Sequence, residues 1–286
     1  MGNQAQKHFL DLVTYTWLAA GAALMVLPFL WMISTSFKLP ADQFSKSLIP
    51  DPPTLRNYIE LFSYGDIHFP QLFLNSTLIS GLITVGQLLT CAMGAFCFAV
   101  VRFKGRDLLF TALILTLLIP FHVTLIPQFI IFKSLHLVGS RAPLWGTVPL
   151  WLPAFWGGAF GTFLLRQYFL TIPRDLVDAA RVDGASLPQI FWRVYLPLAK
   201  PALAALAIFT FQGAWNDLLH PLIYMPAAPN TTLTVGLSLF QTQMAHGGKF
   251  TVLMAGAFVS ILPLVLVFFF AQRHFIQGIA LTGVKR

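Results

Sequence analysis

Long apolar segments dominate this sequence and leave it few folds to adopt. Each contains about 20 to 30 residues, the length that a helix needs to cross a lipid bilayer. Only 10% of the residues are charged and 57% are hydrophobic, whereas a soluble domain carries about 25% charged residues. The sequence therefore predicts an all-α, polytopic membrane protein with six transmembrane helices in a single domain over residues 1–286. The predicted spans are 13–33, 71–101, 108–132, 144–165, 201–224 and 251–271.

The connections between the predicted spans differ in length and composition. Residues 38–70 contain Pro, Asp and Tyr without a sustained apolar period, so we expect an external loop with short helical pieces. Residues 225–250 predict a second external loop, and residues 272–286 predict a polar tail. In the third span, Pro120 and Pro127 predict a kink or a break, because a membrane helix tolerates proline where neighbouring groups satisfy the freed carbonyls.

Small residues and cysteines within the spans predict packing. Gly157 and Gly161 are four positions apart in the fourth span, a spacing that favours close approach of another helix. Cys91 and Cys97 lie in the second span without a nearby His ligand, which is not a metal or redox spacing. We therefore expect both cysteines to be buried and structural.

The basic residues are distributed unequally between the two sides of the membrane. The run 13–33 is too long for the core of a cleavable signal peptide, so we expect it to remain as the first span. With six spans, both termini then lie on the same side as the connection 166–200. Twelve of the 18 basic residues fall on that side: Lys7, Arg102, Lys104, Arg106, Arg166, Arg174, Arg181, Arg193, Lys200, Arg273, Lys285 and Arg286. The positive-inside rule therefore predicts that both termini and this connection are cytoplasmic.

Within that connection, the polar stretch 171–197 carries local helix signals. Pro173 suits the first turn of a helix, and Gly184 can take the left-handed conformation that ends one. Ser186 and Gln189 match a capping box, which begins a second helix. The sequence thus predicts two short helices joined by a tight turn.

Small residues next to that turn favour contact with another protein. Ala179 and Ala180 beside Gly184 leave room for a partner's backbone, and Asp178, Arg181, Asp183 and Arg193 surround them with charge. These residues predict a docking site. The alternative is a solvated amphipathic connection that only joins two spans.

The order of residues in this stretch is Asp178-Ala179-Ala180-x-x-Asp183-Gly184-Ala185, followed by Ile190 and by Leu196-Pro197. This pattern resembles the EAA signature of the permease subunits of bacterial ABC importers. Asp178 stands where glutamate is usual, which keeps the charge on a shorter side chain. Further segments, from Asn75 onward, resemble the carbohydrate-uptake, maltose-permease-like branch: Phe163 to Arg166, Pro201, Trp215-Asn216-Asp217, Thr232 to Gly236, Leu253 to Gly256 and Gln272-Arg273.

The resemblance implies a permease subunit of an ATP-driven, binding-protein-dependent importer for a sugar or oligosaccharide, in the bacterial inner membrane. Importers of glycerol-phosphate-type solutes share the pattern. The implied partners are a second homologous permease, two copies of a cytoplasmic ATPase, an extracytoplasmic solute-binding protein, the sugar and membrane lipid, with no nucleic acid. The residues implied in docking to the ATPase are Asp178, Ala179, Ala180, Arg181, Asp183, Gly184, Ala185, Ser186, Ile190, Leu196 and Pro197.

The chain lacks the sequence of an ATPase. No G-x-x-x-x-G-K-[ST] loop is present, and Gly247-Gly248-Lys249 is followed by Phe250. We find no metal-ligand cluster and no nucleophile with a base and an orienting group. We therefore expect a non-catalytic subunit without a cofactor of its own, with ATP and Mg bound by the partner ATPase. The alternative of a stand-alone secondary transporter lacks support, because no inverted-repeat symmetry is visible.

Asp217 is the conspicuous charge within a predicted span. Placing an ionised Asp at mid-bilayer costs roughly 2.5–3.5 kcal/mol on insertion scales, so it must face the protein interior or water. Two roles compete. In one, Trp215, Asn216 and Asp217 line a substrate pathway and bind hydroxyl groups. In the other, Asp217 pairs with the backbone, His220 or the partner permease and fixes a bend near Pro221.

Overall fold

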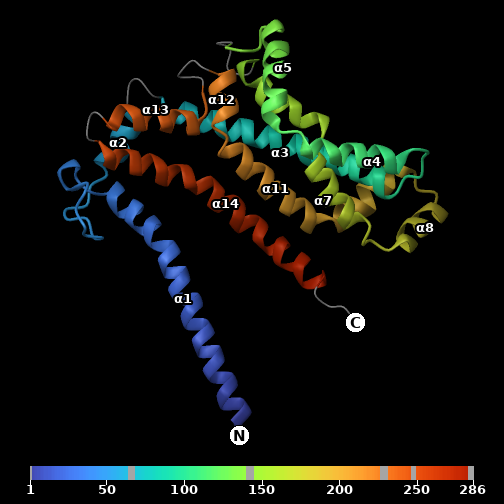
Figure 1. The fold of residues 1–286 in the computed structure, drawn as a ribbon, viewed down its shortest axis with the longest axis horizontal. Helices are drawn as coiled ribbons and strands as arrows, with labels where there is room; N and C mark the ends of the chain where they lie inside the picture. Colours follow the sequence, from blue (N-terminus) through green and yellow to red (C-terminus); the bar gives the residue numbers. More distant parts are fainter. Residues whose placement is uncertain (1, 64–67, 140–144, 226–230, 246–248, 283–286) are drawn as a thin grey trace. The chain divides into compact units, whose positions relative to one another are not determined.

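The chain folds into helices and their connections. The computed structural model describes residues 2–63, 68–139, 145–225, 231–245 and 249–282 (Figure 1). Regular structure in these residues is helical throughout, with no strand among them. The described chain forms two compact units. The first comprises Met1–Phe69 and Leu237–Ile261, and the second comprises Pro70–Gly236 and Leu262–Arg286.

Several helices are long and apolar enough to cross a membrane. Four qualify singly in the part of the chain that the structure describes: Gln6–Ser36, Phe69–Val100, Trp145–Phe169 and Phe250–Phe270. Two bent pairs, Arg106–Leu118 with Phe121–Ser134 and Leu187–Leu198 with Lys200–Trp215, raise the number to six if each pair is one span. The prediction of an all-α, polytopic membrane fold is confirmed.

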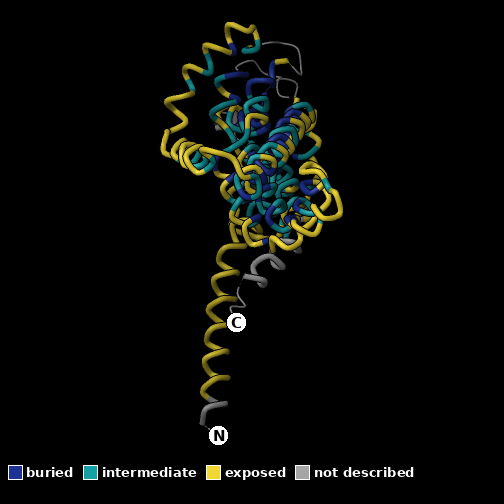
Figure 2. Tube along the Cα trace, turned by 90° about the vertical axis from the view of Figure 1, so that its right-hand side faces the viewer, coloured by how far each residue is buried: buried dark blue, intermediate teal, exposed yellow. Residues whose placement is uncertain are grey.

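The first unit begins with a helix that is exposed over most of its length. Its elements are α1 (Gly2–Ser36), η1 (Pro40–Asp42), α2 (Arg56–Ser63) and the first turns of α14 (Phe250–Thr282). Residues 6–30 of α1 are exposed within the unit (Figure 2). Such apolar exposure suits a lipid environment. The short helices η1 and α2 confirm that residues 38–70 contain helical pieces.

A buried asparagine joins three segments of the first unit. The Nδ2 group of Asn57 in α2 donates to the carbonyl oxygens of Ser36 at 2.8 Å and Lys38 at 2.7 Å. Its Oδ1 accepts a 2.9 Å hydrogen bond from Thr251 Oγ1 at the start of α14. The last residues of α1, the helix α2 and the first turn of α14 are therefore held together by one side chain.

The second unit is built on α3, α7 and α11, and its third predicted span is broken. Its first elements are α3 (Phe69–Ala99), α4 (Arg106–Leu115), η2 (Thr116–Leu118) and α5 (Phe121–Ser134). The chain bends by 94° between η2 and α5, which confirms the break predicted at Pro120. Pro127, in contrast, lies inside α5.

Close helix packing in this unit depends on one of the two glycines in the fourth predicted span. That region contains η3 (Trp145–Thr147), α6 (Val148–Trp151), η4 (Leu152–Trp156) and α7 (Ala159–Phe169). A Cβ atom on Gly161 would lie 2.7 Å from Cys91 Sγ and 3.1 Å from Leu206, so any larger residue would force these side chains of α3 and α11 to shift. Cys91 is buried as predicted, but Cys97 is exposed, so that prediction is wrong. The apolar sequence of α3 does not distinguish its lipid-facing side from its packed side.

The last part of the chain is more helical than predicted. It contains α11 (Lys200–Trp215), α12 (Leu219–Tyr224), α13 (Leu233–Ala245) and α14. The prediction of a loop over residues 225–250 is wrong where α13 forms. The amide of Leu233 donates a 2.8 Å hydrogen bond to Ser76 Oγ of α3, which satisfies one free amide of the first turn. The predicted polar tail continues as helix to Thr282.

Candidate functional site

Two short helices separated by a glycine turn form the connection after α7. The first is α8 (Arg174–Val182), and the second is α9 (Leu187–Ile190), which continues as the π-helix η5 (Phe191–Tyr195) and as α10 (Leu196–Leu198). Gly184 has a φ of 79°, so it adopts the left-handed conformation. Its amide donates to the Arg181 carbonyl at 3.0 Å, and the Ala185 amide donates to the Ala180 carbonyl at 2.9 Å. This pair of bonds is a Schellman motif, and the predicted helix end is confirmed.

The second helix begins with the predicted capping box. The Ser186 amide donates to Gln189 Oε1 at 2.8 Å, and the Ser186 side chain caps the Gln189 backbone in return. Pro188 lies in the first turn, where its missing amide costs no intrahelical bond. Hydrogen bonds between neighbouring residues therefore define the end of α8 and the start of α9 on either side of the turn.

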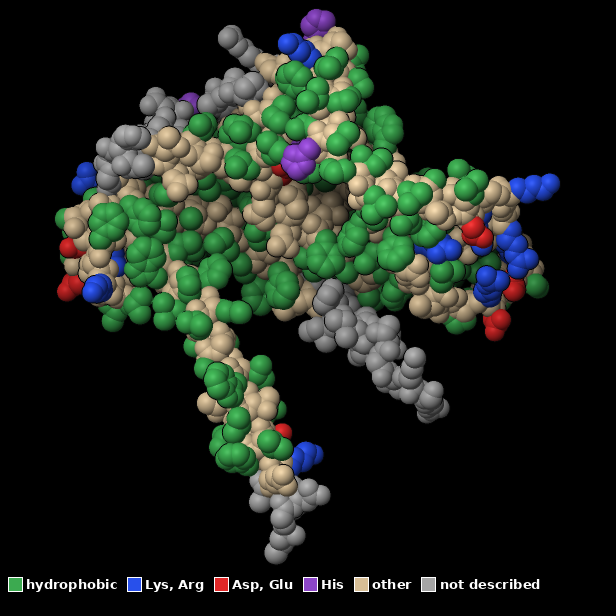
Figure 3. Space-filling model, viewed as in Figure 1, with side chains coloured by type: hydrophobic (Ala, Val, Ile, Leu, Met, Phe, Trp, Pro, Cys, Tyr) green, Lys and Arg blue, Asp and Glu red, His purple; other side chains and the backbone are tan. Residues whose placement is uncertain are grey.

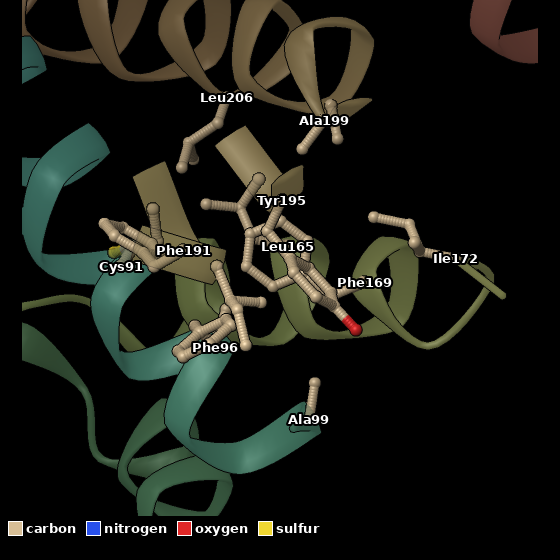
Figure 4. Close-up of a cluster of buried hydrophobic side chains, with 14 of the residues drawn as sticks. Cys91, Phe96, Ala99, Leu165, Phe169, Ile172, Phe191, Tyr195, Ala199 and Leu206 are labelled. Atoms are coloured by element: carbon tan, nitrogen blue, oxygen red, sulfur yellow. The ribbon is translucent and has the colours of Figure 1, made fainter. Parts of the chain in front are cut away.

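One face of this connection is buried against the spans. Val177 of α8 and Ile190 of α9 belong to the same hydrophobic cluster as residues of α3, α7 and α11. Figure 4 shows other members of this cluster, among them Phe96, Leu165 and Phe191, lying together between the helices. The ring of Tyr195 lies 5.1 Å from the rings of Phe96 on α3 and Phe169 on α7. This connection is therefore packed as part of the second unit.

One hydrogen bond attaches the end of the connection to α7, and Arg166 of α7 contacts α3 and α4. The Tyr168 hydroxyl at the end of α7 donates to the Leu198 carbonyl in α10 at 3.2 Å. Arg166 Nε donates to the Phe98 carbonyl at 3.3 Å, and its guanidinium lies 4.1 Å from the centre of the Phe110 ring on α4. The bond from Tyr168, together with the buried cluster, attaches the connection to α7.

The opposite face is exposed and combines small, apolar and charged side chains. We call it the docking knob: Asp178, Ala179, Arg181, Val182, Asp183, Gly184 and Ser186. Asp178 and Arg181 form an exposed ion pair at 3.9 Å. Val182, between the charged residues Arg181 and Asp183, is 88% exposed. The sequence prediction of docking residues did not include Val182.

The predicted docking residues are divided between the two faces. Asp178, Ala179, Arg181, Asp183, Gly184, Ser186 and Pro197 are exposed. Ile190 is only 1% exposed, and Ala180, Ala185 and Leu196 pack against the buried cluster. These four residues therefore lie on the side that supports the knob.

The predicted pathway residues have three different surroundings. Trp215 is buried, and its ring lies 5.5 Å from that of Phe211 and 5.6 Å from that of Phe73. Asn216 is exposed and donates through Nδ2 to the Gln212 carbonyl at 2.9 Å. The indole of Trp215 is thus a packing group within this chain, whereas Asn216 has an open side.

Asp217 lies at the break between α11 and α12 and pairs with His220. Its Oδ2 is 2.8 Å from His220 Nδ1, and its Oδ1 accepts the His220 amide at 3.3 Å. This carboxylate therefore caps the first turn of α12. The ring of Phe121, which follows the break in the third span, lies 5.3 Å from the His220 ring. The two broken helices meet at this pair.

The described residues contain no group of three or more His, Cys, Asp or Glu side chains that could hold a metal ion. The Gly247-Gly248 pair considered above lies outside the described residues.

A family model for the binding-protein-dependent transport system inner membrane component matches residues 86–281. The chain is 36% identical over 269 residues to the arabinooligosaccharides transport system permease protein AraQ of Halalkalibacterium halodurans, covering 92% of each chain. It is 32% identical over 285 residues to the galactooligosaccharides transport system permease protein GanQ of Bacillus subtilis, covering 99% of this chain and 98% of the other. The sn-glycerol-3-phosphate transport system permease protein UgpE of Yersinia pestis is 31% identical, over 94% of this chain and 96% of the other.

The fold also matches a solved structure. A chain from a bacterial ABC transporter involved in the import of the acidic polysaccharide alginate superposes with a TM-score of 0.79 at 24% sequence identity. The match covers 94% of this chain and 98% of that one. The family model covers more than half of the sequence, and several relatives exceed 30% identity over nearly its full length. This chain belongs to the binding-protein-dependent transport system inner membrane components.

Proposed function

We propose that this chain is the permease subunit of an ATP-driven importer for a sugar or oligosaccharide and forms half of its translocation pathway. The names of the relatives AraQ and GanQ, which refer to arabinooligosaccharides and galactooligosaccharides, support this substrate class. A glycerol-phosphate-type solute is the second candidate, because UgpE is 31% identical. The sugar class is preferred since AraQ has the higher identity.

The proposed assembly contains several other proteins. A second, homologous permease completes the pathway, and two copies of a cytoplasmic ATPase bind ATP and Mg. An extracytoplasmic binding protein delivers the solute; one solved relative of this fold is an alginate transporter in complex with a periplasmic protein that binds an alginate pentasaccharide. This chain acts as a non-catalytic subunit, with both termini and the docking knob in the cytoplasm, as the distribution of basic residues supports.

The observation that carries the proposal is the two-sided connection after α7. Its knob is exposed, whereas Val177 and Ile190 on its other face are buried with residues of α3, α7 and α11. We expect the knob to seat in a cleft of the ATPase. Closure of the two ATPases would then move the knob, and the buried cluster would pass that movement to the spans as a rigid-body tilt.

The residues at the α11–α12 break have separate proposed roles. Asp217 fixes the break through His220, Trp215 packs the end of α11, and Asn216 is the member that faces the pathway. This assignment favours the structural role for Asp217, because its carboxylate already contacts two groups of His220, the backbone amide and Nδ1.

Purification of the tagged chain from its native host tests the proposal. In mild detergent, mass spectrometry should identify an ATPase and a second permease in stoichiometric amounts. Val182→Asp should abolish recovery of the ATPase with the purified chain, because a carboxylate at the centre of the knob would be desolvated on docking. Ile49→Asp is the matched control, since Ile49 is also an exposed apolar residue, at 78%, in the loop before α2.

Two results would contradict this assignment. Undiminished recovery of the ATPase with Val182→Asp would show that docking occurs elsewhere. Recovery of this chain alone, in a form that moves solute without ATP, would favour a secondary transporter.

A further inference from the structure

Arginine side chains surround a groove beside the docking connection. The groove has a volume of about 450 Å³ and lies between the α3–α4 turn and the start of α8. Its lining residues are Arg102, Phe103, Gly105, Arg106, Asp107, Leu108 and Arg174. Arg102, Arg106 and Arg174 also line a smaller cavity of about 70 Å³ next to it, where Arg181 and Asp178 join them. Both cavities lie within the second unit.

The charges in these cavities are unbalanced. Arg106 pairs with Asp107 at 2.9 Å, and Arg181 pairs with Asp178 at 3.9 Å. Arg102 and Arg174 have no ion-pair partner among the residues that the structure describes. The sites therefore hold two guanidinium groups in excess of their carboxylates. Guanidinium groups bind phosphate through paired, charge-assisted hydrogen bonds.

Exposed apolar side chains adjoin the same arginines. Leu108 is 75% exposed and Phe103 is 39% exposed, and both line the groove with Arg102 and Arg174. By length and composition, the candidate span Phe69–Val100 ends just before this turn and the next candidate begins at Arg106, so the groove follows the end of one candidate span and the start of the next. In Figure 3, Lys and Arg side chains gather over α4 and α8 beside hydrophobic side chains.

We propose that this groove binds the headgroup phosphate of an anionic phospholipid, through Arg102 and Arg174, with an acyl chain against Leu108. Two other ligands explain the groove less well. A soluble anion would bind the arginines without contacting the exposed Leu108. An acidic surface of the ATPase would leave Leu108 exposed to water. Basic pockets at the cytoplasmic ends of transmembrane helices bind the headgroups of anionic lipids.

A bound lipid would connect the membrane surface to the docking connection. Arg174 is the first residue of α8, whereas Arg102 lies in the turn after α3. One phosphate held by both would therefore brace the docking helix against the end of a span. The inference depends on the proposed function only for placing this side in the cytoplasm.

Native mass spectrometry of the purified full-length chain tests the proposal without the ATPase. The chain is delipidated, mixed with phosphatidylglycerol or phosphatidylcholine, and compared with Arg102→Gln/Arg174→Gln. We expect retention of phosphatidylglycerol by the unchanged chain and about 30-fold weaker binding by the double variant, at about 1 kcal/mol for each arginine near the membrane surface. Arg193→Gln/Lys200→Gln removes two exposed charges outside the groove and should retain the lipid.

Several outcomes would overturn the lipid site. Equal retention of phosphatidylglycerol by the double variant and the unchanged chain would show that the arginines do not hold it. Protection from thermal unfolding by inorganic phosphate as strong as that by phosphatidylglycerol would assign a general anion site. If Arg102→Gln/Arg174→Gln bound phosphatidylglycerol normally but, in a separate purification from the native host, no longer recovered the ATPase, the arginines would belong to ATPase docking. Failure of the proposed transport function would not alter these lipid measurements.

Discussion

The amide of Ala185 donates a 2.9 Å hydrogen bond back to the carbonyl of Ala180, which closes α8 around Gly184. Both alanines also pack against the buried cluster that contains residues of the spans. The bond therefore sets the direction in which the chain leaves α8 and, with it, the shape of the docking knob. This shape depends on a backbone conformation that glycine adopts without strain.

Gly184→Val should impair ATP-coupled uptake. Gly184 has a φ of 79°, and apart from Gly184 and its two chain neighbours no described atom lies within 4 Å of the position that its Cβ would take, so the cost is conformational and not a clash. The left-handed conformation costs an L-residue about 1–2 kcal/mol, and a β-branched residue resists it most. Uptake by reconstituted importer and recovery of the ATPase are the measurements.

Gly184→Asn is the control for this variant, because asparagine enters the left-handed region more readily than valine. It should retain most of the uptake. If Gly184→Val matched the unchanged chain in coupled uptake, the role assigned to this turn would be wrong.

Ile190→Ala should destabilise the docking connection from its buried side. Ile190 is 1% exposed within the cluster, and removing a buried aliphatic side chain costs about 2–5 kcal/mol, including the cavity that remains. Leu187→Ala, one turn earlier and 40% exposed, should cost much less. Thermal unfolding in detergent measures both variants. Equal losses would show that α9 does not depend on this contact.

Asn57→Leu should lower the stability of the first unit more than Thr251→Val does. The first change leaves two carbonyl groups and the Thr251 hydroxyl without their partner, whereas the second removes one hydrogen bond. A buried group left unsatisfied costs about 1–3 kcal/mol. Protease resistance of the loop 38–55 in detergent compares the two. The reverse order of resistance would contradict the role given to Asn57.

Local signals predicted the helix end and the capping box in the connection after α7 because they act within a few residues. The end of α8 at Gly184 and the box of Ser186 with Gln189 depend only on neighbouring backbone groups. The burial of Ile190 depends instead on a cluster with residues of α3, α7 and α11, and a pattern within a few residues cannot predict such contacts. Val182 was missed since it is apolar, although its neighbours are polar.

Tertiary contacts explain the other differences between sequence and structure. Helix α13 begins where the Leu233 amide meets Ser76, 157 positions earlier, so its residues alone resemble a loop. Cys97 lies on an apolar helix whose packed and lipid-facing sides have the same composition, so its exposure was not predictable. Pro120 was predictable as a break because the missing amide acts locally, but the 94° bend required the folded neighbours.

Asp217→Leu should disrupt the α11–α12 break, whereas Asp217→Asn should largely preserve it. The Asp217 carboxylate contacts the backbone amide of His220 at 3.3 Å and its Nδ1 at 2.8 Å. The side-chain oxygen of asparagine can still accept the backbone amide, and its side-chain nitrogen can still contact Nδ1. Leucine can do neither, so we expect poor assembly with the partner permease and a lower melting temperature for Asp217→Leu. With Asp217→Asn, assembly, basal ATPase activity and most of the uptake should remain. If Asp217→Asn assembled normally, kept its basal ATPase activity and still lost uptake, the carboxylate would belong to the substrate pathway, and its assignment as the residue that fixes the helix break would have to be abandoned.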